Sequence, residues 1–120
     1  MHTIAITEVR GMSYPQGEPE PRETIVGLRA AITPPVDLNP EAVRNYIDAG
    51  NFDRRGDGLA PLQNPMLVGS TSEATIIRAG VVPGDEKTAQ RELFGTRVSE
   101  LLGFMGLETE VRQANSPDLK

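Results

Sequence analysis

Cysteine and tryptophan are both missing from this chain of 120 residues. The lack of cysteine excludes disulfide bonds, thiolate nucleophiles, iron–sulfur clusters and cysteine-ligated zinc. The only aromatic side chains besides one histidine are three Phe and two Tyr. A hydrophobic core must therefore consist mainly of aliphatic side chains and methionine.

A basic excess is missing as well. The chain has 12 Lys and Arg against 17 Asp and Glu, so its net charge is −5. Phosphate neutralisation supplies most of the affinity for nucleic acid, and basic patches draw proteins to anionic lipid. We therefore expect no direct nucleic-acid partner and no membrane partner. The opening MHTIAITEVR lacks the pattern of a signal peptide, and no apolar run approaches ~20 residues, so we expect a cytoplasmic or virion location.

Groups suited to catalysis are scarce. His2 is the only histidine, and its place at the terminus argues against an oriented, catalytic or metal-ligating ring. Glu108 and Glu110 alternate with apolar residues, which predicts a solvated strand face rather than an acid–base pair. We expect no enzyme activity.

Three short motifs invite a binding interpretation. Residues 51–58 (NFDRRGDG) resemble part of a calcium loop, but Arg54 and Arg55 fall among the candidate ligands and no Glu closes the loop. The tripeptide at 55–57 spells the integrin-binding RGD, which glycine-rich turns also contain. Residues 84–88 lack the glycine that a phosphate-binding loop has before its lysine. We expect no metal and no cofactor.

The hydrophobic pattern predicts seven elements. Glycine (12) and proline (10) are abundant, which predicts long, stiffened connections between them. The expected strands are 3–9, 24–32 and 107–111, the expected helices are 40–49 and 86–105, and 66–82 form a hairpin turning at 70–73. The alternative for 66–82 is a helix opened by a capping box of Ser70 and Glu73.

Several positions define these elements. The second strand places Val26, Leu28, Ala30 and Ile32 on one face. Asn39 caps the first helix and Gly50 ends it, while Asp85 caps the second and Gly106 ends it. The second helix carries an apolar stripe of Phe94, Val98, Leu101 and Met105, with Gly95 and Gly103 serving close packing.

The expected fold class is α+β, in the order β-β-α-β-β-α-β, with a small, mainly antiparallel sheet and helices on one face. Residues 1–113 form one domain and 114–120 a polar tail. A proline-rich arm at 10–23 and a loop at 51–65 interrupt the domain.

The arm is the best candidate for a functional surface. Prolines lower the entropy lost when such a segment docks, and two sizeable apolar side chains supply anchors. The expected interface residues are Met12, Tyr14, Pro15, Pro19 and Pro21. They favour a non-enzymatic structural subunit of a large assembly, most concretely a viral (phage) capsid decoration or minor capsid protein. Its partners would be subunits of the same assembly, as a homo-oligomer or on a larger particle. The alternatives are a small acidic inhibitor of a basic partner and an enzyme accessory subunit.

Overall fold

The computed structural model describes residues 1–13, 17, 19–53, 62–84 and 87–113. These residues form five strands and two helices, which confirms the α+β class and the order β-β-α-β-β-α-β. The elements are β1 (His2–Ser13), β2 (Arg22–Thr33), α1 (Pro40–Asp53), β3 (Gln63–Ser70), β4 (Thr75–Gly84), α2 (Thr88–Gly103) and β5 (Thr109–Gln113).

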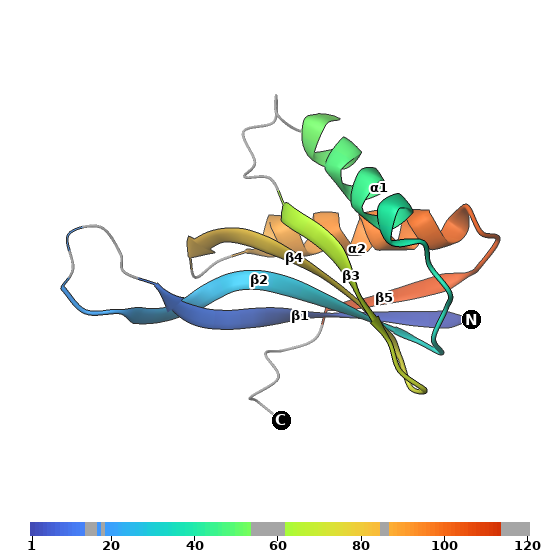
Figure 1. Cartoon of the computed structure of the whole chain (residues 1–120), viewed down its shortest axis with the longest axis horizontal. Helices are drawn as coiled ribbons and strands as arrows, with labels where there is room; N and C mark the ends of the chain where they lie inside the picture. The colour runs from blue at the N-terminus through green and yellow to red at the C-terminus, as the bar shows by residue number, and fades with distance from the viewer. Residues whose placement is uncertain (14–16, 18, 54–61, 85–86, 114–120) are drawn as a thin grey trace.

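The strands lie in the order β3-β4-β2-β1-β5, so β2 occupies the centre of the sheet. Pairing is antiparallel throughout except between β1 and β5, which run parallel. Both helices lie on the same side of this sheet, and the other side is uncovered by any described element (Figure 1). The arrangement therefore has two layers and one open sheet face.

The core lies between the sheet and the helices. Alternate residues of the strands point into it, including Ile4 and Ile6 of β1 and Leu28 of β2, all fully buried. Each such side chain stabilises the fold by ~1.5–3 kcal/mol relative to an exposed one. Val26 is only half-buried, contrary to the sequence pattern, because the register between β2 and β4 shifts between Ile25 and Gly27. Ile25 takes the core position instead and is 1% exposed.

The segment 66–82 is the expected hairpin and not a helix. Strands β3 and β4 pair around a turn at 71–74, in which the Thr71 N–H donates to the Ala74 carbonyl at 2.8 Å. Thr75 then ties the hairpin to the chain before α1. Its buried hydroxyl donates to the Val36 carbonyl at 2.8 Å and accepts from the Val36 N–H at 2.9 Å.

Helix α1 begins as its sequence predicts. The Asn39 side-chain oxygen accepts hydrogen bonds from the N–H groups of Glu41 and Ala42, at 2.9 and 3.1 Å. The expected end at Gly50 is wrong, because the helix continues to Asp53. A glycine inside a helix costs only ~1 kcal/mol relative to alanine, and the neighbouring turns outweigh that cost here. The connection after α1 is therefore shorter than the expected loop at 51–65.

Helix α2 is shorter than predicted at both ends. It begins at Thr88 after Lys87 in the cap position, whereas the expected cap, Asp85, lies outside the described residues. It ends at Gly103, two residues before Met105, the predicted last residue, and the chain turns at Gly106 with φ +80°. Met105 therefore leaves the apolar stripe and is 48% exposed.

The remaining stripe residues, Phe94, Val98 and Leu101, are buried against the sheet. Gly95 allows a close approach to β5, because a Cβ atom there would lie 2.8 Å from Cγ1 of Val111. The same expectation for Gly103 is wrong, since a Cβ atom there would meet nothing within 4 Å.

Candidate protein–protein interface

Strands β1 and β2 continue past the helices as a two-stranded ribbon. Its paired residues are 10–13 and 22–25, and the name ribbon also covers residues 19–21 at its outer end. Figure 1 shows it projecting from the body of the molecule at the end opposite the N-terminus. Its pairing includes Met12 with Glu23 and Ser13 with Arg22. The expectation of an unpaired arm from residue 10 to residue 23 is therefore wrong. The prolines that argued against a strand fall at 15, 19 and 21, outside the paired positions.

The base of the ribbon is fixed to the core. A β-bulge shifts the register between Val9 and Arg10, and such a bulge increases the local twist of a strand pair. Just before it, the Glu8 carboxylate accepts a hydrogen bond from the Arg91 guanidinium of α2 at 2.6 Å. Arg10 lies 3.4 Å from the same carboxylate. A charged contact therefore joins the base of the ribbon to α2.

The outer part of the ribbon exposes the side chains that the sequence singled out. Met12 is 64% exposed, which is unusual for a large apolar residue that is paired in a strand. Pro19 and Pro21 are exposed as well. Tyr14 and Pro15 lie outside the described residues. The described ribbon side chains can therefore reach a partner without any rearrangement of the core.

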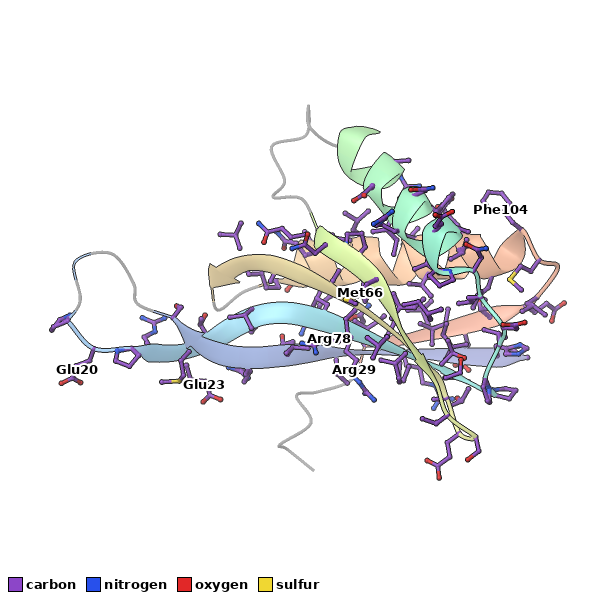
Figure 2. All side chains as sticks on the ribbon, viewed as in Figure 1. Glu20, Glu23, Arg29, Met66, Arg78 and Phe104 are labelled. Carbon is purple, nitrogen blue, oxygen red and sulfur yellow. The ribbon has the colours of Figure 1, made fainter. Side chains whose placement is uncertain are left out.

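A second surface lies on the open sheet face. The strand register places Thr7, Arg29, Arg78 and Met66 in one row across β1, β2, β4 and β3, named here the arginine row. Figure 2 shows the labelled members Arg29, Arg78 and Met66 close together near the centre of the view, on β2, β4 and β3. Met66 is 54% exposed, so the row combines two guanidinium groups with an exposed thioether.

The two positive charges of the arginine row are not neutralised by any acidic side chain of the described residues. Arg29 and Arg78 are direct cross-strand partners, and like charges in that position destabilise a sheet. Within the described ranges, neither guanidinium has an ion pair or a side-chain hydrogen bond. The hydroxyl oxygen of Thr7 is buried, also without a partner among these residues. A local positive surface therefore remains on a chain of net charge −5.

An aromatic cluster occupies the other end of the molecule. The rings of Tyr46 and Phe104 meet edge to face with centroids 5.4 Å apart, and the Arg97 guanidinium lies 5.2 Å from the Tyr46 ring centroid. The Tyr46 hydroxyl donates to Glu100 at 2.7 Å, and this hydrogen bond, with burial, raises the pKa of Tyr46 above 10.0. Phe104 is 74% exposed, so the cluster is a surface feature.

Metal-ligating side chains do not cluster in the described residues. No group of three or more His, Asp or Glu side chains in this part of the chain could hold a metal ion. A shallow hollow of about 220 Å³ lies between the start of α1 and β3, lined by Pro40, Glu41, Arg44, Pro65, Met66 and Leu67. The candidate calcium ligands after Asp53 and the RGD tripeptide lie outside the described residues.

Sequence reasoning missed the arginine row and the exposure of Phe104. Alternation alone could place Arg29 and Arg78 opposite the apolar faces of their strands. Their adjacency depends on the pairing of β2 with β4, which are separated along the chain by α1 and β3. Phe104 is exposed because α2 ends one residue before it.

The chain has no match in any of three comparisons with known proteins. No protein-family model, no curated protein and no solved structure is similar to it. Neither helix of the described part has the length and apolar character needed to cross a bilayer. The ribbon and the arginine row are therefore interpreted from their chemistry alone.

Proposed function

We propose that this chain is a non-enzymatic structural subunit of a large assembly, with a viral capsid decoration or minor capsid protein as its most concrete form. The observation that carries the proposal is the ribbon, which projects beyond the helices with Met12 64% exposed. A pair of strands already joined by hydrogen bonds loses less conformational entropy on docking than a free loop does. Such an element suits contact with a neighbouring subunit.

The distribution of acidic side chains supports an assembly subunit over an acidic inhibitor. A phosphate-mimicking inhibitor needs its carboxylates concentrated on one face, where their field attracts a basic partner. Here exposed carboxylates are spread over the ribbon, both helices, the β3–β4 turn and β5, for example at Glu20, Glu41, Glu73, Glu92 and Glu110. The arginine row on the open sheet face carries two guanidinium groups instead.

Sedimentation of the native complex tests the proposal. The chain, tagged and expressed at its natural level in its source cells, should travel in a density gradient with material much heavier than a monomer of 13.0 kDa. Replacing residues 12–21 with a Gly/Ser linker of equal length should release it from that material. Circular dichroism of the purified variant should still report a folded domain, because the core residues are untouched.

Two single-residue variants, one in the ribbon and one outside it, make the test more specific. Met12→Ser should weaken incorporation, since a few buried apolar side chains usually dominate an interface. Met105→Ser changes an exposed methionine of the turn that follows α2, away from the ribbon, and should have no effect on incorporation. Normal incorporation of both the linker variant and Met12→Ser would refute the role of the ribbon.

A further inference from the structure

We infer that the arginine row of one copy binds the acidic end of the ribbon of a second copy. This inference rests on the proposed function and identifies the partner of the ribbon. The acidic end is defined here by Glu20 and Glu23, both exposed. Arg22 lies between them and has an interaction of its own. Segment 14–23 holds three Glu against this one Arg, so its sequence is net negative. Carboxylates and guanidinium groups form charge-assisted, often bidentate hydrogen bonds, which orient a contact as well as stabilise it.

The two charged groups cannot satisfy each other within one chain. Glu23 and Arg29 lie on the same strand, six residues apart, which corresponds to roughly 20 Å along an extended backbone. Figure 2 shows Glu20 and Glu23 toward the outer end of the ribbon, and Arg29 and Arg78 over the middle of the sheet. Contact between them therefore requires a second molecule.

Charge also decides against the symmetric alternative. If two copies stacked their open sheet faces about a two-fold axis, their arginine rows would be brought close together across the contact. Juxtaposed like charges in an interface cost several kcal/mol, so this arrangement is disfavoured. A contact between two different surfaces avoids the repulsion, because the positive row faces a negative segment.

The apolar side chains of the two surfaces are matched as well. Met12 is paired with Glu23 on the ribbon, and Met66 stands beside Arg78 in the arginine row. Their exposed fractions are 64% and 54%. Methionine adapts its shape readily, so the two thioethers provide a flexible apolar contact beside the ion pairs. A contact between unlike surfaces propagates from copy to copy, into a ring or a filament.

Charge reversal and mixing test the inference. Self-association of the purified full chain is measured by sedimentation velocity as a function of concentration. Arg29→Glu/Arg78→Glu reverses the row, and Glu20→Arg/Glu23→Arg reverses the ribbon. Each variant alone should self-associate at least about tenfold more weakly than the original chain, because attraction becomes repulsion. A mixture of the two should associate again, because each reversed surface then meets its complement.

Controls make the same kind of charge change elsewhere. Glu73→Arg in the β3–β4 turn and Glu92→Arg in α2 alter exposed residues outside both surfaces and should leave self-association within about twofold of the original. Added salt should weaken the association of the original chain, since screening shortens the range of exposed charges. Circular dichroism confirms that each variant is folded.

Three results would overturn the inference. The first is a monomer at every soluble concentration at low salt. The second is self-association that both reversals leave unchanged, and the third is a mixture that fails to recover. These results are distinguishable from failure of the proposed function. A chain that is monomeric alone but still enters its heavy complex through the ribbon keeps its assembly role with a different partner.

Discussion

Replacing Gly95 by alanine measures how closely α2 approaches β5. In a helix interior, alanine is favoured over glycine by ~1 kcal/mol, so the substitution should stabilise an uncrowded site. Here the added Cβ would lie 2.8 Å from Cγ1 of Val111, a stiff β-branched side chain. Overpacking of this kind costs ~1–3 kcal/mol. Because the second effect is larger, Gly95→Ala should lower the free energy of unfolding by ~1 kcal/mol net.

The Val111 side chain decides whether Gly95→Ala raises or lowers the free energy of unfolding. A double-mutant cycle therefore isolates the contact between residues 95 and 111. In a Val111→Ala background, the next neighbours of the new Cβ are Nε2 of Gln113 at 3.5 Å and Cγ1 of Ile6 at 3.6 Å, which is ordinary van der Waals contact. Gly95→Ala should then stabilise the protein by up to ~1 kcal/mol. The assay is urea denaturation followed by circular dichroism, with free energies of unfolding from linear extrapolation.

Gly103→Ala supplies the matched control. It makes the same substitution in the same helix, where the new Cβ meets nothing within 4 Å, and should be neutral or stabilising by up to ~1 kcal/mol. The reasoning is refuted if Gly95→Ala alone stabilises the chain, or if its effect is the same with and without the Val111 side chain.

Three further substitutions test other contacts. Thr75→Val should destabilise the fold by ~1–3 kcal/mol in urea denaturation, because it leaves the partly buried N–H and carbonyl of Val36 without their partner, whereas Thr75→Ser should cost clearly less. Arg78→Gln should stabilise the monomer by ~0.2–1 kcal/mol by removing repulsion from Arg29, and Arg78→Lys, which keeps the charge, should not. Glu100→Gln should lower the pKa of Tyr46 in an ultraviolet titration, because the Glu100 hydrogen bond is the largest cause of its elevation. The pKa of Tyr46 is higher in the folded than in the unfolded chain, so the stability that Tyr46 contributes is present below pH 10.0 and is lost as the pH rises through the folded pKa. An unchanged titration of Tyr46 in Glu100→Gln would contradict the role given to the Glu100 hydrogen bond.

The sequence was sufficient to predict those elements whose signals are local. Asn39 forms a cap with its own neighbours, and the 71–74 turn closes within four residues, so both could be identified without the rest of the chain. Some predictions of features that depend on distant partners were wrong. The core position of Ile25 follows from a register shift between β2 and β4, which no local pattern encodes.

The candidate interface also combines features that the sequence predicts with features that it does not predict. Exposure of Met12 could be predicted because the proline-rich sequence beside it lacks the apolar residues that would cover it. The overall proline content of segment 10–23 argues against a strand, whereas the pairing that stiffens the ribbon depends on the positions of the prolines, which lie at 15, 19 and 21 beyond the paired residues. The arginine row required the strand order of the sheet, and periodicity within one strand contains no information about that order.

The parallel pair of β1 and β5 has a consequence for how the chain folds. His2 pairs with Thr109, so the first and last described strands meet only when nearly the whole chain is available. During synthesis, the β1–β2 hairpin can form early, while the outer edge of β1 keeps its backbone hydrogen-bonding groups unpaired until β5 has left the ribosome. Closing so long a loop is slow, and an open edge can pair with another chain in the meantime. A nascent chain truncated before residue 109 should therefore aggregate more readily than the complete one.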